Sequence, residues 1–301
     1  MLRRWHRRRS APRSYDDGVG GPVWRVGDRA FECSERTLVM GILNVTPDSF
    51  SDGGRFFNEV YAARHATQMV ADGADFIDVG GESTRPGSDP VPVAEELARV
   101  IPVIGRLVGE IPGVPISIDT RKAEVAAAAL DAGASIVNDV SGGIDPGMFD
   151  VVRERRAAIV LMHMKGEPKT MQEAPVYDDV VAEVRGYLSQ RVEAAAFAGI
   201  EAERIAIDPG IGFGKELEDN LALMHGLGGL LELGRPVLVG PSRKRFIGTL
   251  LGDLPPEERV DGTAGAVAWL VTRGAHIVRV HDVREIVRVV RVVDAIARAG
   301  E

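Results

Sequence analysis

The chain has 301 residues, of which 45% are hydrophobic and 27% charged, and its formal net charge is −8. These values are typical of a water-soluble globular protein, no apolar stretch reaches the roughly 18 residues of a membrane span, and the acidic balance argues against a broad nucleic-acid-binding face. The single cysteine, Cys33, cannot form an internal disulfide. We therefore expect a cytoplasmic protein with neither a membrane nor a nucleic-acid partner.

The first thirteen residues carry six arginines and no apolar core of a signal peptide, and the segment "SYDDGVGGP" follows at residues 14–22. This composition is typical of a flexible segment. We expect residues 1–22 to form a disordered basic tail and residues 23–301 to form one domain. A weak anion-binding or targeting arm is the alternative function for the tail.

Short aliphatic or β-branched runs recur along the remaining chain, and each stops at a polar residue. They are predicted strands at residues 37–44, 76–82, 115–120, 135–139, 158–164, 205–210, 236–242 and 277–282. Between most of them lie longer stretches with apolar residues at helical spacing, such as residues 124–133 and 183–199. The predicted unit is therefore a strand followed by a helix, repeated eight times.

The fold class follows from the burial that these runs imply. Near-continuous apolar strands indicate a parallel sheet covered by helices on its outer face. The pairs Gly73-Ala74, Gly133-Ala134 and Gly274-Ala275 stand just before predicted strands, where a glycine suits the left-handed end of a helix. Eight units predict an α/β fold with a closed parallel (β/α)8 barrel, a TIM barrel. An open doubly wound sheet is the competitor, but the first strand lacks its glycine fingerprint.

In such a barrel the active site lies at the C-terminal ends of the strands. Polar residues gather at these ends in unusual density, and together they predict a binding site. They are Asn44, Glu82, Asp119, Asn138, Asp139, His163, Asp208, Lys244, Arg279 and His281.

The basic residues of this set predict an anion site. Arg279 and His281 are two apart and should point to the same face of the last strand, and Lys244 follows the neighbouring strand together with Arg243. Guanidinium and ammonium groups suit a diphosphate, and Asn44 could help to hold a magnesium ion. An arginine on a buried strand otherwise needs a carboxylate partner, and Asp282 is predicted to face the other way.

The carboxylates Asp119 and Asp208 end two different strands and would be desolvated there. A heterocycle with an amino-amide edge, such as a pterin or guanine, offers paired N–H donors to a carboxylate, and Asn138 can serve the remaining groups. The alternative is a simple ion pair between Asp208 and Lys244. The two interpretations are compatible.

Two further segments invite a functional interpretation that their spacing does not support. The run "GIGFGK" at residues 210–215 lacks the spacing and the hydroxyl residue of a phosphate-binding loop. His163, within "MHM", is expected to be packed or hydrogen-bonded rather than a metal ligand, with a modest role in the pocket left open.

The ordered motifs of the chain resemble the dihydropteroate synthase family of the folate pathway. The resemblance rests on "GILNVTPDSFSDGG" at residues 41–54 and "DVGGESTRPGS" at 78–88, followed by "SIDT", "NDVSGG", "MHMKGEP", "DPGIGFGK", "SRKRFIG" and "RVHDV". It extends over residues 37–299. It implies a transferase on a (β/α)8 barrel that joins a dihydropterin hydroxymethyl diphosphate to p-aminobenzoate, releases pyrophosphate and is a target of sulfonamides.

The resemblance also implies roles for individual residues and a magnesium cofactor. Asp119, Asn138, Asp208 and Lys244 would line the pterin pocket. Asn44, Arg279 and His281 would hold the magnesium diphosphate, with Asn44 as the metal ligand and with Thr84 and Arg85 contributing from the second loop. The catalytic set would be Asn44, Lys244, Arg279 and His281. The p-aminobenzoate site would be bordered by Phe50, Pro86 and Phe213.

The same resemblance implies a homodimer packed through the last helices, and it predicts that the segment Leu43 to Gly54 is a mobile loop that closes over the reaction. Pro241 departs from the expected small residue before "SRK" and removes a backbone donor. The alternatives are a corrinoid-type pterin methyltransferase and a non-catalytic pterin-binding homologue. Sulfonamide sensitivity and the role of the tail are not determined by the sequence.

Overall fold

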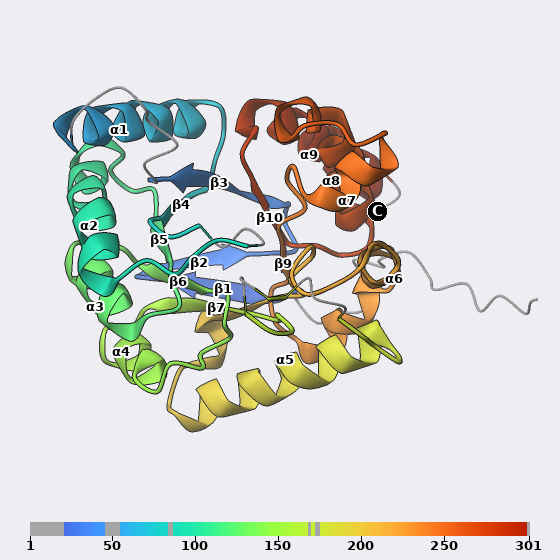
Figure 1. Cartoon of the computed structure of the whole chain (residues 1–301), viewed down its shortest axis with the longest axis horizontal. Coiled ribbons are helices and arrows are strands. Elements are labelled where there is room, and N and C mark those ends of the chain that lie inside the picture. The colour runs from blue at the N-terminus through green and yellow to red at the C-terminus, as the bar shows by residue number, and fades with distance from the viewer. Residues whose placement is uncertain (1–20, 46–54, 84–86, 168–169, 172–174, 300–301) are drawn as a thin grey trace, which may run out of the picture.

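The computed structural model describes residues 21–45, 55–83, 87–167, 170–171 and 175–299. Eight parallel strands form one sheet in the order β8-β7-β6-β5-β4-β3-β10-β9. A bridge between Ile207 of β8 and Val237, just before β9, brings the two ends of this sheet together. The strands occupy the centre and the helices surround them (Figure 1). The predicted (β/α)8 barrel is confirmed.

The barrel strands lie close to their predicted places, and all pair in parallel. Their bounds are β3 Leu38–Asn44, β4 Phe76–Gly80, β5 Ile116–Asp119, β6 Ile136–Asp139, β7 Ala158–Met162, β8 Ile205–Asp208, β9 Leu238–Val239 and β10 Ile277–Val280. Only β9 is much shorter than its predicted run at 236–242. Proline has no backbone N–H for the sheet, and Pro236 and Pro241 flank this strand.

The crossover helices and short turns alternate with the strands. Their bounds are α1 Arg55–Ala71, α2 Val93–Glu110, α3 Ala123–Asp131, α4 Met148–Glu154, α5 Val180–Phe197, η2 Ala202–Arg204, α6 Leu217–His225, η3 Leu227–Leu233, α7 Arg245–Leu250, η4 Pro256–Glu258, α8 Val260–Thr272 and α9 Val283–Arg298. The glycines before the strands have the expected left-handed backbone, with φ of 110° at Gly73, 112° at Gly133 and 98° at Gly274. None of the helices in the described ranges is long and apolar enough to cross a membrane.

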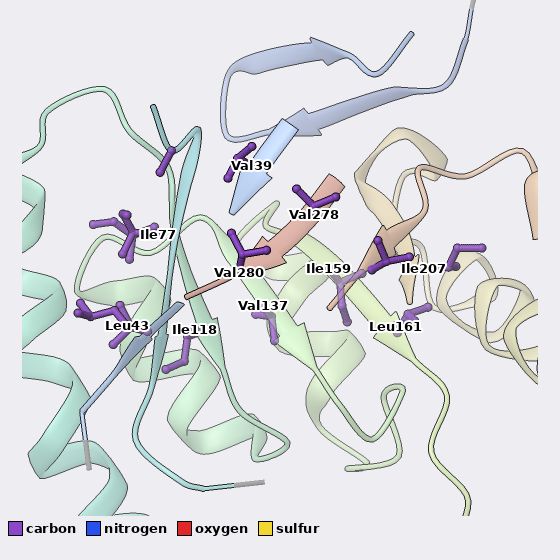
Figure 2. Close-up of a cluster of buried hydrophobic side chains, with 14 of the residues drawn as sticks. Val39, Leu43, Ile77, Ile118, Val137, Ile159, Leu161, Ile207, Val278 and Val280 are labelled. Atoms are coloured by element: carbon purple, nitrogen blue, oxygen red, sulfur yellow. The ribbon is translucent and has the colours of Figure 1, made fainter. Parts of the chain in front are cut away.

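Two apolar cores follow from the alternation of side chains along each strand. Outward residues such as Val39, Leu43, Ile77 and Ile159 pack between the sheet and the helices (Figure 2). Inward residues fill the barrel itself, among them Met40, Phe76, Ile136, Val160, Ala206 and Ile277. Two residues after Phe76, Ile136, Ala206 and Ile277, on the same inward face, stand the polar residues Asp78, Asn138, Asp208 and Arg279. The alternation therefore directs these polar side chains into the mouth of the barrel.

A β-hairpin that the sequence analysis did not identify precedes the barrel. It consists of β1 Val23–Val26 and β2 Arg29–Glu32, joined by a turn in which Gly27 has a φ of 57°. Trp24 is fully buried, its ring lies edge-on to Phe76 at a centroid distance of 5.3 Å, and its Nε1 donates to the carbonyl of Arg204. The hairpin therefore closes the N-terminal end of the barrel, opposite the polar mouth.

Candidate active site

An arginine joins two carboxylates at the centre of the barrel mouth. Arg279, on β10, donates from Nε to Oδ2 of Asp78 at 2.6 Å and from a terminal nitrogen to Oδ2 of Asp119, also at 2.6 Å. Asn138, on β6, donates to the same Oδ2 of Asp78 at 3.0 Å. The predicted carboxylate partner of Arg279 is therefore supplied by β4 and β5. The predicted orientation of Asp282 is consistent with this arrangement, because Asp282 accepts two hydrogen bonds from Arg243 instead.

Each of these carboxylates keeps an oxygen without a partner among the described residues. Oδ1 of Asp78 and Oδ1 of Asp119 are both buried and accept no hydrogen bond there. A buried acceptor without a donor destabilises a fold by about 1–3 kcal/mol. Burial raises the pKa of Asp119, the neighbouring charge of Arg279 opposes the shift, and the nearby Asp78 adds to it. The site is thus short of N–H donors, which a ligand can supply.

Asp208 provides a further carboxylate on the opposite part of the barrel. It ends β8, is 5% exposed, and accepts a hydrogen bond on Oδ1 from the backbone N–H of Gly210 at 2.7 Å. Burial raises its pKa to about 6, and the backbone donor and the positive charge of Lys244 limit the shift. A ligand that donates to Asp208 would restore its ionised form.

Lys244 and Phe213 form the wall of the mouth beside Asp208. The ammonium of Lys244 lies 3.6 Å from the centroid of the Phe213 ring, a cation–π contact. Gly212 lets the lysine stem approach, because a Cβ at this position would lie 2.9 Å from its Cδ. Phe213 itself is 8% exposed and packs with Val140, Met162 and Met171. The predicted pterin lysine and the predicted p-aminobenzoate phenylalanine are therefore neighbours.

His281 lies just after β10 and is held by Ser242. The Ser242 hydroxyl accepts from the backbone N–H of His281 at 3.2 Å and lies 2.9 Å from Nδ1 of its ring. Asn44 ends β3 and is partly buried. A pocket of about 450 Å³ opens between α1 and the start of α9, bordered by Asn44, His281 and Arg243. Asp78, Asp119 and Asp208 do not border this pocket.

Other predicted polar residues serve the loops around the mouth. Asp139 accepts from the backbone N–H groups of Ser141 and Gly143, and Glu82 pairs with Lys122 and Arg121. His163 is buried and hydrogen-bonded, as expected. Four residues that the resemblance implied lie outside the described residues: Phe50, Thr84, Arg85 and Pro86. So does most of the predicted mobile loop, at residues 46–54.

Three residues of the site were not singled out from the sequence. Asp78 was quoted only within a motif, yet it stands two residues after the inward-facing Phe76 and so points into the mouth. Alternation from Phe76 could have identified it. Ser242 and Lys215 had no comparable signal. Ser242 contacts His281, 39 positions away, and Lys215, which lies behind the site, contacts His163, 52 positions away, as well as two carbonyls of its own turn.

The described residues offer few protein ligands for the predicted magnesium ion. No cluster of three or more histidine, cysteine, aspartate or glutamate side chains able to hold a metal occurs in the part of the chain that the structure describes. Magnesium, however, keeps several waters and is commonly held by one protein group together with substrate phosphates. The side-chain oxygen of Asn44, close to Gly80 at the barrel mouth, fits a single ligand of this kind.

Comparison with known proteins identifies the family. The sequence pattern described as pterin binding enzyme matches residues 40–281. The dihydropteroate synthase of Bacillus subtilis (strain 168) is 50% identical over 272 residues, which cover 90% of this chain and 92% of the relative. The chain belongs to the dihydropteroate synthase family.

Solved dihydropteroate synthases share the fold. The Xanthomonas albilineans dihydropteroate synthase with 4-aminobenzoic acid is 49% identical, with a TM-score of 0.86 over 93% of this chain and 99% of that one. The Yersinia pestis dihydropteroate synthase in a sulfonamide drug complex is 41% identical, with a TM-score of 0.87 over 92% of this chain and 100% of that one. The chain is therefore a folate-pathway transferase of this family.

Proposed function

We propose that this chain condenses 6-hydroxymethyl-7,8-dihydropterin diphosphate with p-aminobenzoate to give 7,8-dihydropteroate and pyrophosphate. The side chains of the barrel mouth bind the two substrates and stabilise the leaving group. The observation that carries this assignment is the pair of buried carboxylate oxygens, on Asp78 and Asp119, that accept no hydrogen bond from any residue the structure describes. The amino-amide edge of a pterin presents the N–H groups that these oxygens require. Asp119, Asn138, Asp208 and Lys244 bind the pterin.

The diphosphate is held by Arg279, His281 and Asn44, with Thr84 and Arg85 from the second loop. Ser242 orients the ring of His281, because its hydroxyl accepts from the His281 backbone N–H and lies 2.9 Å from Nδ1. We assign donation to a phosphate oxygen to the other ring nitrogen, Nε2. A bound magnesium ion would neutralise part of the diphosphate charge, and Asn44 would be its protein ligand.

The reaction requires little covalent work from the protein. The C–O bond to the diphosphate breaks, and its electron pair leaves on the diphosphate oxygen. The electron-rich dihydropterin stabilises the methylene cation, the amine nitrogen of p-aminobenzoate attacks it, and that nitrogen then loses a proton. The chain stabilises the departing charge and holds the amine against the wall that Lys244 and Phe213 form, and we assign Phe50 and Pro86 to the same subsite. Sulfonamides compete for this wall.

We also propose a cytoplasmic homodimer. Leu250, Leu251, Trp269, Val292 and Ile296 are large apolar residues exposed on or beside the last helices, and Val292 and Ile296 share one face of α9. These residues support packing between two copies. Light scattering should give twice the chain mass, and Ile296→Lys should give a monomer. The buried lone Cys33 suits a reducing compartment.

Pterin binding tests the assignment of the carboxylates. Asp119→Asn places an N–H group where the pterin donates, so the affinity should fall by about 1–3 kcal/mol, or roughly 5- to 150-fold. Asp131→Asn is the control, because Asp131 pairs with Arg155 on the surface at the far end of α3. Calorimetric titration of each variant with a dihydropterin gives the comparison. Equal affinities for Asp119→Asn and the parent would remove Asp119 from the pocket.

A further inference from the structure

A buried lysine lies behind the Phe213 wall, and the assigned chemistry does not use it. Lys215 is 2% exposed, and Nζ lies within 3.0 Å of three acceptors: the carbonyl oxygens of Gly210 and Phe213, each at 2.9 Å, and Nδ1 of His163 at 3.0 Å. The carbonyl oxygen of His163, at 3.5 Å, makes a fourth and longer contact. An ammonium has three N–H donors, and these three acceptors use all of them. Burial lowers the pKa of Lys215 to about 7, and the negative charge of Asp208 opposes the shift.

The acceptors belong to the turn that carries Phe213. Gly210, Gly212 and Gly214 all have left-handed backbone, with φ of 69°, 81° and 56°. This course directs the carbonyls of Gly210 and Phe213 toward the interior, onto Nζ of Lys215. Few backbone bonds hold the turn itself, the one between Phe213 N–H and the Gly210 carbonyl measuring 3.1 Å. Side chains also hold the turn from outside, because the Gly212 N–H donates to Asn220 Oδ1 and the Tyr177 hydroxyl donates to the Gly214 carbonyl, both at 2.6 Å. The Lys215 ammonium is the attachment that joins Gly210 to Phe213.

The neighbouring strand supplies the third acceptor. His163 is 6% exposed, and burial together with the charge of Lys215 lowers its pKa to about 3. The ring is neutral at physiological pH, so Nδ1 can accept the lysine hydrogen. A Cβ at Gly210 would lie only 1.9 Å from the His163 carbonyl oxygen, which shows how closely the two loops pack. Lys215 thus joins the turn after β8 to the end of β7.

We propose that Lys215 is a positioning residue for the p-aminobenzoate subsite: its buried ammonium ties Gly210 and Phe213 to His163 and so fixes the Phe213 ring against Lys244. The proposal rests on the assigned function. Asp119 and Asn138 lie on β5 and β6, which pair with each other away from this turn, and only Asp208 contacts it, through Gly210. Lys215 should therefore act on the second substrate more than on the first.

The test compares substrate constants for Lys215→Met, which keeps the length and removes the donors. We expect the KM for p-aminobenzoate to rise at least about tenfold while dihydropterin affinity changes by less than about threefold. Phe213→Ala should shift the same constant in the same direction. Lys165→Met is the control, since Lys165 lies nearby with an exposed side chain over Tyr177, and it should leave the constant unchanged.

A pair of variants at His163 keeps the test decisive if Lys215→Met does not fold. His163→Leu removes the third acceptor and should raise the same KM by about two- to fivefold. His163→Asn places an amide oxygen near the position of Nδ1 and should restore it. A lower melting temperature with unchanged substrate constants, or an equal loss for both substrates, would overturn the proposal. An inactive parent enzyme would instead overturn the assigned function, and this proposal with it.

Discussion

Replacing Arg279 should damage folding as well as turnover. The side chains of Asp78 and Asp119 are 0% and 9% exposed, and Arg279 is the cation that both contact. Removing one partner of a buried ion pair destabilises a protein by about 3–5 kcal/mol, because the other charge is left uncompensated. Arg279→Ala should lose stability of that order. It should also lose about 2–4 kcal/mol of transition-state stabilisation, or roughly 30- to 1000-fold in rate.

A second substitution separates the two effects. Asp78→Asn keeps an oxygen to accept from Asn138 and removes one of the charges that Arg279→Ala leaves behind. The double variant should therefore regain about 1–3 kcal/mol of stability relative to Arg279→Ala, while turnover stays low. Arg155→Ala is the matched control, because Arg155 makes a bidentate pair with Asp131 on the surface and such pairs contribute about 0–1 kcal/mol.

Urea unfolding and pyrophosphate release give the two readings. The reasoning is refuted if Arg279→Ala unfolds within about 1 kcal/mol of the parent, or if the double variant is less stable than the single one. Near-full turnover of Arg279→Ala would separately remove the arginine from the diphosphate site.

Three further predictions concern Asp208, the turn after it and the hairpin. Burial raises the pKa of Asp208 to about 6. The folded chain therefore keeps a proton on this carboxyl that the unfolded chain releases near pH 4. The stability that this group contributes is present at low pH and declines as the pH rises from about 4 to about 6. Asp208→Asn should make the decline shallower in urea titrations across this range and leave the part due to Asp119, whose pKa burial also raises. Gly210→Ala should lose about 3–5 kcal/mol, because its new Cβ meets the His163 carbonyl, whereas Gly234→Ala, left-handed but with open space around it, should lose about 1 kcal/mol in the same assay. Trp24→Ala should lose about 3–5 kcal/mol on thermal or urea unfolding, and the turnover of folded molecules should stay unchanged because the hairpin lies at the other end of the barrel.

The sequence was sufficient to predict the eight strands and the polar residues that end them. Both follow from local patterns: an apolar run, a turn, and the alternation that directs Asp119, Asn138 and Arg279 inward. The hairpin at Val23–Glu32 was missed, although its alternation and its Gly27 turn carry a signal, because each strand is only four residues long.

The partners of the charged residues could not be predicted in the same way. Arg279 pairs with Asp78 and Asp119, which precede it by 201 and 160 residues, and only the register of three separate strands brings them together. Lys215 was set aside with the sequence "GIGFGK", because that run lacks the spacing and the hydroxyl residue of a phosphate-binding loop. Its burial depends on three acceptors that only the folded turn assembles.

The most direct test of the central assignment is pyrophosphate release by the purified chain with magnesium, the dihydropterin diphosphate and p-aminobenzoate, each omitted in turn. We predict release that requires both organic substrates, with dihydropteroate as the product. Release that proceeds at the same rate without p-aminobenzoate, or no release from a chain that binds the pterin, would contradict the condensation and the roles assigned to the barrel mouth.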